Sequence, residues 1–354
     1  MKVLITGGCG FVGSNLAISI KKNFLDSDVI CFDNLSRRGS ELNLKKILSY
    51  GVKFIHGDVR IKTDFDKISK VDLVIDAAAE PSVLAGDSYG ELENLMETNL
   101  LGTINTLYFV KKHYSSFIFL STSRVYPYDK LEKINIDKLK NRFAISINQS
   151  ILGINNNGIS EKFTLEGVRS LYGATKLCSE YLIQEFSHNF NIPCVINRCG
   201  VISGPFQMGK IDQGVIVLWM AKHYWKRKLS YIGYGGKGHQ VRDVLHINDL
   251  YNLIEWQIKN INVHKSNIFN VGGGNKNAIS LYELTEICEK ITGNKIVIDS
   301  KLESRPGDIP LYITDNTKIF NFSGWKPKKS IVDILTEIHK WIKDDEVFLK
   351  SILS

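Results

Sequence analysis

A glycine-rich turn directly after the first apolar run limits the folds open to this chain more than any other feature. The run is followed by Thr6-Gly7-Gly8-Cys9-Gly10-Phe11-Val12-Gly13, in which Gly7, Gly10 and Gly13 have the spacing of a dinucleotide-binding turn. The first glycine permits a sharp exit from a strand, the second lets phosphates approach the backbone, and the third lets helix and strand pack closely. The pattern predicts a strand, a phosphate-binding turn and a helix in succession.

Acidic residues follow this turn where such a fold would use them. Asp33 ends the second apolar run, where a carboxylate accepts hydrogen bonds from the adenosine ribose and repels the extra phosphate of NADP, so NAD is favoured. Arg37 and Arg38 come soon after, and arginines here can accommodate a 2′-phosphate, which leaves NADP as an alternative. Asp58, after the third run, is either an adenine contact or a helix cap.

Short apolar runs alternate with helical patterns over residues 1–203, which indicates βαβ units and a parallel sheet. We expect strands at 3–6, 29–32, 52–56, 73–77, 117–121 and 194–197, and helices at 12–23, 41–49, 92–113 and 170–189. Because the crossovers are right-handed, the strand order should reverse beside the first strand. The predicted fold is α/β, a Rossmann-like doubly wound parallel sheet with a smaller mixed α/β C-terminal substrate lobe.

Two stretches interrupt this rhythm and suggest the domain organisation. Residues 127–167 are polar, and a loop of this length usually has a function. Residues 204–354 mix helical and strand patterns. We expect an NAD-binding Rossmann domain at 1–203, with a substrate loop at 127–167, and a mainly substrate-binding lobe at 204–354 with segments that return to the first domain.

Composition narrows the class of protein. The 354 residues, 44% hydrophobic and 23% charged, are typical of a globular chain, and no apolar stretch reaches the length of about 20 residues that spans a bilayer. Six scattered cysteines predict reduced thiols and no metal site, and the first residues form a strand pattern without a secretory leader, so we expect a cytoplasmic protein. The net charge of +8 suits an anionic small substrate, nucleic acid or a membrane surface, but the basic run Lys222 to Lys228 is typical of a solvated helix end.

A possible catalytic pair lies in the predicted helix 170–189. Tyr172-Gly173-Ala174-Thr175-Lys176 places a phenol and an ammonium on one helical face, one turn apart. A tyrosine must lose about three pKa units to act as a base at neutral pH, which is roughly 4 kcal/mol. One cation about 4 Å away, at an effective dielectric near 20, supplies a similar amount. Lys176, together with an oxidised nicotinamide, therefore makes Tyr172 a workable base.

The glycine turn together with Tyr172 and Lys176 resembles the extended short-chain dehydrogenase/reductase family of sugar-nucleotide epimerases and dehydratases. The likeness continues through Thr98 to Thr103, Leu120 to Tyr126 and Arg242 to His246. It implies an NAD-dependent enzyme in which Thr122 bonds the reacting sugar oxygen. A strand-end hydroxyl bonded to the local backbone is the alternative for Thr122.

The same resemblance implies two sets of binding residues. Those for the cofactor are Gly7, Gly10, Phe11, Val12, Gly13, Asp33, Asn34, Ser36, Arg37, Asp58, Val59, Ala77, Ala78, Ala79, Asn99, Ser121, Tyr172 and Lys176. Those for the substrate are Pro81, Ser123, Arg124, Asn197, Gln213, Arg242 and Arg305. Arg242 and Arg305 suit a diphosphate because a guanidinium binds phosphate oxygens bidentately, although surface or Asp-paired arginines are the alternative. For Asn197 the alternative is structural hydrogen bonding.

The residues after Thr122 bear on the reaction. Dehydratases of the family carry an Asp-Glu pair there to eliminate water, whereas this chain has Ser123 and Arg124, so dehydration is disfavoured. What remains is removal of a hydride from a sugar carbinol, reorientation of the bound ketone and return of the hydride to its other face. Net epimerisation follows, with NAD regenerated.

Within the family the likeness extends furthest toward enzymes that invert C2 of a CDP-linked 3,6-dideoxyhexose. It is carried by Phe32 to Arg37, the long stretch before Tyr172, Asp212-Gln213-Gly214 and Gln240 to His246, while Asp76-Ala77-Ala78-Ala79 replaces the commoner His-x-Ala-Ala. A homodimer or homotetramer is also implied, without nucleic acid or membrane partners. The alternatives are a 4-epimerase or oxidoreductase of a UDP-, GDP- or dTDP-sugar, and an RNA- or partner-binding protein on the same fold.

Overall fold

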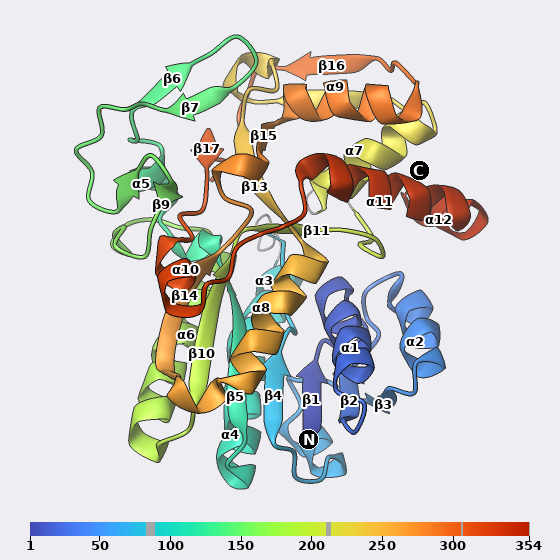
Figure 1. Cartoon of the computed structure of the whole chain (residues 1–354), viewed down its shortest axis with the longest axis vertical. Coiled ribbons are helices and arrows are strands. Elements are labelled where there is room, and N and C mark those ends of the chain that lie inside the picture. Colours follow the sequence, from blue (N-terminus) through green and yellow to red (C-terminus); the bar gives the residue numbers. More distant parts are fainter. Residues whose placement is uncertain (83–88, 210–213, 306, 354) are drawn as a thin grey trace. The chain divides into compact units, whose positions relative to one another are not determined.

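The computed structural model describes residues 1–82, 89–209, 214–305 and 307–353 (Figure 1). Contacts between Cα atoms divide the chain into two compact units, each of which is described by itself. The first unit contains Met1–Val125, Ser170–Arg198 and Tyr251–Phe269, and the second contains Tyr126–Arg169, Cys199–Leu250 and Asn270–Ser354. Within the described ranges, none of the helices is both long enough and apolar enough to cross a membrane.

The first unit is built on a seven-stranded sheet in the order β14-β10-β5-β4-β1-β2-β3. The strands from β1 to β5 pair in parallel, and the order reverses at β1, which lies between β2 and β4. The predicted Rossmann-like sheet is thereby confirmed. The strands are β1 (Lys2–Thr6), β2 (Asp28–Asp33), β3 (Lys53–His56), β4 (Leu73–Asp76), β5 (Ser116–Thr122), β10 (Cys194–Cys199) and β14 (Lys265–Val271).

The helices of this unit alternate with its strands. They are α1 (Phe11–Asn23), α2 (Ser40–Ser49), η1 (Lys62–Lys67), α3 (Tyr89–Met96), η2 (Glu97–Leu101), α4 (Gly102–His113), η3 (Ser123–Val125), α6 (Leu171–Phe190), the larger part of α8 (Ile247–Lys259) and η5 (Ile261–Val263). The single helix predicted at 92–113 is interrupted by η2, a π-helical turn that contains Asn99. Such turns inside α-helices are frequent at functional sites.

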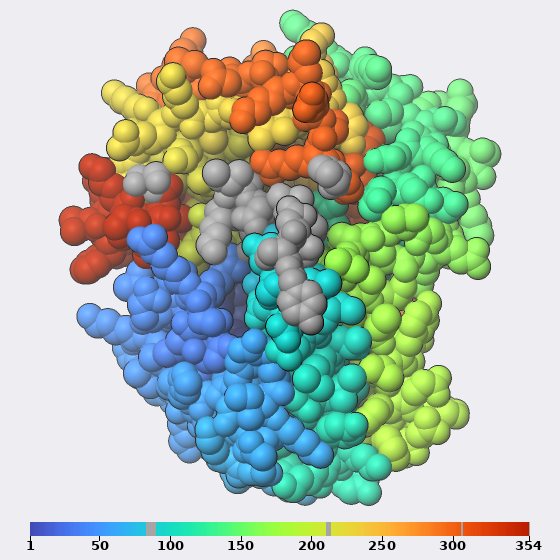
Figure 2. Space-filling view, turned by 180° about the vertical axis from the view of Figure 1, so that it is seen from behind, coloured from blue at the N-terminus to red at the C-terminus, as the bar shows by residue number. Residues whose placement is uncertain are grey.

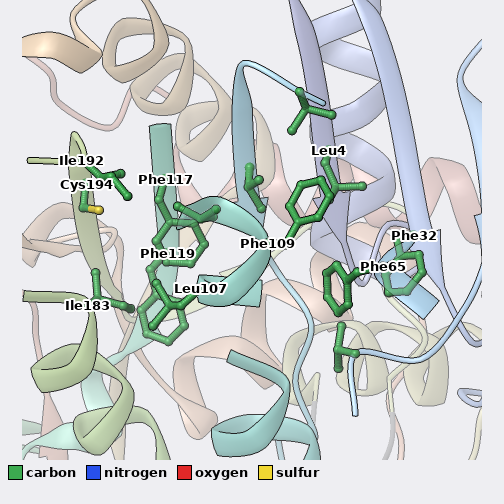
Figure 3. Close-up of a cluster of buried hydrophobic side chains, with 14 of the residues drawn as sticks. Leu4, Phe32, Phe65, Leu107, Phe109, Phe117, Phe119, Ile183, Ile192 and Cys194 are labelled. Atoms are coloured by element: carbon green, nitrogen blue, oxygen red, sulfur yellow. The ribbon is translucent and has the colours of Figure 1, made fainter. Parts of the chain in front are cut away.

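A hydrophobic core covers one face of this sheet (Figure 3). Because side chains alternate along a strand, Leu4, Phe32 and Phe119 point to this face together. Phe65 of η1 packs on Phe32, with ring centroids 4.9 Å apart, and α4 and α6 close the core further along. Figure 2 shows α4 and α6, in teal and yellow-green, side by side on this side of the unit.

The same face becomes polar at the carboxyl ends of the strands. Thr6 and Asp76 follow Leu4 and Val74 by two positions, so their side chains continue the same rows beyond the apolar core. Both are buried. This is the edge at which open α/β sheets bind their ligands.

The second unit contains a small sheet in the order β11-β13-β15, with β17 also paired to β13. Its strands are β6 (Ile136–Lys138), β7 (Phe143–Ile145), β8 (Ile154–Asn155), β9 (Gly158–Ile159), β11 (Val201–Ser203), β12 (Leu229–Ile232), β13 (Val241–His246), β15 (Ala278–Ser280), β16 (Ile298–Lys301) and β17 (Leu311–Tyr312). Its helices are α5 (Tyr128–Leu131), α7 (Val215–Tyr224), η4 (Tyr234–Gly236), η6 (Asn275–Asn277), α9 (Leu281–Thr292), α10 (Thr317–Ser323), α11 (Ile331–Asp344) and α12 (Glu346–Leu353).

Local signals define two helices of this unit. Both α9 and α11 begin with a capping box, in which Ser280 pairs with Glu283 and Ser330 pairs with Asp333. Helix α9 ends at Gly293, which has a φ of 71°. A glycine adopts this left-handed conformation without the strain of a Cβ atom, so it stops the helix.

Residues 127–167, expected to form a polar loop, contain α5 and two short antiparallel hairpins, β6-β7 and β8-β9. The amide of Ile159 donates to the carbonyl of Ile313 (2.8 Å), and the amide of Asp315 donates to the carbonyl of Ile159 (3.0 Å). These two bonds join the β8-β9 hairpin to a segment far along the chain. The strands of both hairpins have only two or three residues, too few for an alternating pattern to indicate them.

Replacing Gly13 with Ala is expected to destabilise the protein by about 1–3 kcal/mol, the usual cost of overpacking. A Cβ atom at Gly13 would collide with the carbonyl oxygen of Gly7 and lie 2.9 Å from the Cα of Gly8, so α1 would have to move from β1. Chemical denaturation measures the loss. The matched control is Gly90→Ala in α3, where a Cβ meets nothing within 4 Å. That variant should be neutral or gain up to about 1 kcal/mol, and equal midpoints for both variants would contradict the steric argument.

Candidate functional site

The glycine turn between β1 and α1 forms a cradle that side chains would fill. Gly7 has a φ of 62°, and a Cβ there would lie 2.8 Å from the carbonyl oxygen of Ala77. Helix α1 is capped by Gly10, which has no side chain to bond the amides of the first turn, including those of Phe11 and Val12. A helix N-terminus without a side-chain cap, behind a turn that has no Cβ atom at Gly7, Gly8 or Gly10, fits the diphosphate of a dinucleotide.

Asp33, at the end of β2, is fixed beside this cradle. Its Oδ2 accepts a hydrogen bond from the amide of Cys9 (2.9 Å), and its Oδ1 accepts one from the amide of Leu35 (2.8 Å). Burial raises the pKa of Asp33, while the hydrogen bonds from Leu35, Cys9 and Gly10 and the charge of His56 lower it. The hydrogen bond from Cys9 holds the Asp33 carboxylate next to the glycine turn. A contact with the adenosine ribose stays a prediction for this position.

The structure gives Asp58 several local partners. Its Oδ2 accepts from Nδ2 of Asn34 (2.8 Å) and lies 2.7 Å from Nη2 of Arg60, while its Oδ1 accepts from the amide of Arg60 (2.9 Å). Burial raises the pKa of Asp58, but the bonds from Arg60 and Asn34 outweigh it and lower the pKa to about 2. Asp58 does not cap a helix, because η1 begins after Ile61; its carboxylate instead accepts from the amide of Arg60 in a local turn, and the adenine contact stays a prediction. Beside it, the carbonyl of Val59 accepts from Nδ2 of Asn105 (2.9 Å).

The loop after β4 packs directly on the glycine turn. The amide of Ala77 donates to the carbonyl of Thr6 (3.2 Å), and Gly7 leaves room for the backbone of Ala77 and Ala78. The loop continues through Ala79 to Pro81, whose surfaces are half-buried. After β2, the amide of Ser36 donates to Oδ1 of Asn34 (3.0 Å), and Arg37 is half-buried.

Asn99 in the π-helical turn joins this loop to α6. Its Oδ1 accepts from the amide of Glu80 (2.8 Å), and its Nδ2 donates to the carbonyl of Glu80 (3.0 Å) and to Oγ1 of Thr175 (3.3 Å). Asn99 is buried, so it holds the loop and the helix in place from within.

The end of β5 and the start of α6 meet closely. A Cβ at Gly173 would collide with the carbonyl oxygen of Arg124, so this glycine lets η3, with Ser123 and Arg124, lie against the helix. Thr122 at the end of β5 accepts a hydrogen bond from the amide of Arg124 (3.2 Å) and is buried. The turn η3, which directly follows Thr122, therefore packs against Gly173, the residue after Tyr172.

The predicted tyrosine–lysine pair occupies the sheet-facing side of α6. Tyr172 is half-buried in the first turn of the helix. Lys176 is only 2% exposed, and its Nζ lies 4.1 Å from the ring centroid of Phe119 in β5. Tyr172 therefore lies at the N-terminal end of α6. The Lys176 ammonium is enclosed, in a position that favours a cation–π contact with Phe119.

One ionic network was missed in the sequence. Glu180 follows Lys176 by one turn, is fully buried, and accepts hydrogen bonds from Arg198 of β10, with Nη2 2.7 Å from Oε2 and Nε 3.1 Å from each oxygen. Ser121, the residue before Thr122, donates its hydroxyl to Oε1 of the same carboxylate. The four-residue spacing of Tyr172, Lys176 and Glu180 was the available signal, because it places all three on one helical face.

Asn197, predicted to bind substrate, makes structural hydrogen bonds with its side-chain amide. It is fully buried on β10, and its amide pairs reciprocally with that of Gln257 on α8, at 2.9 and 2.8 Å. The geometry corresponds to the structural alternative, because both amide atoms already have partners. Gln213 lies outside the described residues.

The two predicted arginine motifs come together within the second unit. Arg242 on β13 donates from Nη2 to Oδ1 of Asp308 (2.9 Å) and to the carbonyl of Ile309 (2.8 Å). Asp308 belongs to the segment that contains Arg305, whose carbonyl accepts from the amide of Asp308 (3.1 Å). Arg242 is thus Asp-paired, yet one-fifth of its side chain stays exposed, and Arg305 is half-buried.

A parallel sheet with a glycine cradle at β1, an acid at the end of β2 and a tyrosine–lysine pair on α6 defines a nicotinamide-dependent enzyme fold. Residues 3–272 match the NAD dependent epimerase/dehydratase family. The chain belongs to this family. The resemblance noted in the sequence, the enzyme class and the NAD cofactor are therefore confirmed.

Relatives in this family cover almost the whole chain. The chain is 31% identical to CDP-paratose 2-epimerase of Salmonella typhi, over 96% of this chain and 99% of the relative. It is 25% identical to dTDP-glucose 4,6-dehydratase of Salmonella typhimurium, over 96% and 92% of the two chains. Among solved structures, a variant of UDP-glucuronic acid 4-epimerase from Bacillus cereus, in complex with UDP-4-deoxy-4-fluoro-glucuronic acid and NAD, is 25% identical with a TM-score of 0.79, covering 97% of this chain and 99% of that one.

Replacing Glu180 with Gln is expected to destabilise the protein by about 3–5 kcal/mol, because Arg198 is left as a buried, uncompensated charge. Urea denaturation provides the measurement. The control is Asp344→Asn, which breaks the pair with Lys340 on α11, where both side chains are more than half exposed. That change should cost less than about 1 kcal/mol. Similar losses in the two variants would show that the buried pair has no special weight.

Proposed function

We propose that this chain inverts C2 of a CDP-linked 3,6-dideoxyhexose, converting CDP-paratose to CDP-tyvelose through a transient ketone. The observation that supports an epimerase is the packing of η3, which directly follows Thr122, against the start of α6, the helix that carries Tyr172 and Lys176. The choice of sugar is supported by the likeness to the Salmonella typhi CDP-paratose 2-epimerase, which extends over nearly the full length of both chains.

The proposed chemistry assigns one task to each of the three side chains. The Tyr172 phenolate accepts the proton of the C2 hydroxyl and later returns it, and Thr122 donates a hydrogen bond to the same oxygen. The Lys176 ammonium stabilises the phenolate from one turn further along α6. A bound NAD would supply a reversible acceptor for the hydride of C2. The glycine cradle and Asp33 would hold its diphosphate and its adenosine ribose.

Two side chains argue for epimerisation rather than dehydration. Ser123 and Arg124 stand where the dehydratases of the family carry an Asp-Glu pair, and neither is an acid that can protonate a departing hydroxyl. A second candidate is a 4-epimerase of another nucleotide sugar, which the likeness to UDP-glucuronic acid 4-epimerase favours.

The proposed substrate anchors are Arg242 and Arg305. Asp308 fixes the orientation of the Arg242 guanidinium through their 2.9 Å bond, and a preset fork binds a diphosphate with less loss of side-chain entropy. While the nucleotide is held, rotation about the phosphate bonds can present both faces of the ketone.

We also infer that the protein is a homodimer or homotetramer and that it is cytoplasmic. The six free thiols, five of them buried, suit a reducing compartment.

The purified enzyme is expected to convert CDP-paratose in preference to UDP-, GDP- and dTDP-linked sugars. In D₂O the product should contain no carbon-bound deuterium, because the hydride returns directly from the cofactor. NMR spectroscopy of the sugar carbinols measures both the conversion of each nucleotide sugar and the deuterium content of the product. Preferred turnover of a UDP-sugar at C4 would select the second candidate, and accumulation of reduced cofactor with a free ketone would indicate an oxidoreductase instead.

Tyr172→Phe is expected to lower kcat by about 100- to 10,000-fold, which is the usual contribution of a positioned general base. The bound dinucleotide should remain, since the variant lacks only a hydroxyl. The assay combines steady-state turnover with the nucleotide content of the purified protein. Tyr181→Phe is the control, because this tyrosine lies on the same helix and is 54% exposed. Unchanged turnover in the Tyr172 variant would refute its role as the base.

A further inference from the structure

Asp76, the last residue of β4, is a carboxylate enclosed in the first unit. It is 2% exposed, and its Oδ1 and Oδ2 accept hydrogen bonds from Oγ1 of Thr6 (2.6 Å) and of Thr103 (3.3 Å). The short bond from the Thr6 hydroxyl suits an ionised group, while the single proton of the Thr103 hydroxyl is shared with the carbonyl of Asn99 (3.0 Å). A carboxylate placed this deeply requires a compensating positive charge or extensive hydrogen bonding.

Strand register places the Lys176 ammonium over the same part of the sheet. In the parallel pairing, Asp76 is opposite Thr6 on one side and Phe119 on the other, so these three side chains point to one face. The Nζ of Lys176 lies 4.1 Å from the Phe119 ring centroid. A buried ammonium thus lies over the direct neighbour of a buried carboxylate.

Two buried carboxylates, Glu180 and Asp76, lie near Lys176 and have different partners. Glu180, one turn beyond Lys176 on α6, accepts hydrogen bonds from Arg198 of β10 through both of its oxygens. Asp76 comes from β4, and its pKa is raised by burial and lowered most by Lys176. Tyr172 completes the titratable groups on this face of α6. Glu180 is thus engaged with Arg198, and Asp76 is a buried carboxylate on the same face of the sheet whose charge interacts with Lys176.

We propose that Asp76 is a positioning residue that keeps Lys176 in its ammonium form and holds it over Phe119, and thereby supports Tyr172 as the base. This inference rests on the proposed function of Tyr172. It assigns a role to the carboxylate that this chain carries where relatives commonly have a histidine before the Ala-Ala pair. An imidazole could not serve in the same way, because its neutral form supplies no negative charge.

Asp76→Asn tests the proposal while preserving the shape of the side chain. Without the countercharge, burial favours neutral lysine, so Lys176 should lose its proton at lower pH. The alkaline limb of the pH profile of kcat/KM should therefore shift down by at least about one pH unit. The control is Asp72→Asn, which removes the same charge from an exposed side chain just before β4. An alkaline limb unchanged from wild type in the Asp76 variant would overturn the proposal.

A second readout does not depend on turnover. NMR of protein carrying ¹³C at the lysine Cε atoms reports the protonation of Lys176, assigned by its loss in Lys176→Met. In the wild type the Lys176 signal should not titrate below about pH 9, and in Asp76→Asn its midpoint should fall. A wild-type midpoint clearly below pH 9, or the same midpoint in both proteins, would contradict the proposal. If Asp76→Asn does not fold, the wild-type titration alone decides.

The outcomes separate this inference from the proposed function. Full turnover by Tyr172→Phe would show that Tyr172 is not the base, and would reject the proposed function whatever the result for Asp76. An inactive Tyr172→Phe, together with wild-type pH limbs and lysine titration in Asp76→Asn, would leave the base in place and reject only the role of Asp76. A uniform fall in kcat at every pH with a lower unfolding midpoint would assign Asp76 a purely structural role, and would also reject the proposal.

Discussion

Helix α6 brings two charged side chains, Lys176 and Glu180, out of water and onto the sheet, and much of the first unit is arranged to compensate them. Glu180 meets Arg198 of β10 at 2.7 Å, and the residue before Thr122 adds a further donor. Pairing of this kind contributes little net stability compared with an apolar core, but breaking it is costly. The network therefore fixes α6, which carries Tyr172, relative to β10 and to β5, which ends at Thr122.

The parts of the site that were predictable from the sequence are those set by local stereochemistry. Gly7 and Gly13 are spaced as a turn under a diphosphate requires, and Asp33 follows at the end of the next strand. Each requirement involves a few neighbouring residues, so the pattern was sufficient. The six predicted strands all lie in the sheet, with ends shifted by one or two residues, for the same reason. A seventh strand, β14, was missed because it is an isolated segment far along the chain.

What the pattern could not provide depends on partners distant in sequence. Asn197 was predicted to bind substrate, yet its amide is paired with Gln257, 60 positions later. The β8-β9 hairpin bonds to Ile313 and Asp315, and the role of Glu180 on α6 depends on Arg198 in β10. Asp76 was visible only as a departure from the commoner sequence. Its burial between Thr6 and Thr103 emerges from the register of three elements.

A compensated lysine suits the reversibility that epimerisation demands. In the proposed reaction Tyr172 must release the same proton that it took, so excessive stabilisation of its phenolate would slow the second half as much as it speeds the first. A lone buried ammonium would favour the phenolate strongly, because charges interact strongly where the dielectric is low. In the proposed arrangement the Asp76 carboxylate opposes part of that field, because it interacts electrostatically with Lys176. Such a balance suits a phenol that must act first as a base and then as an acid in the same reaction.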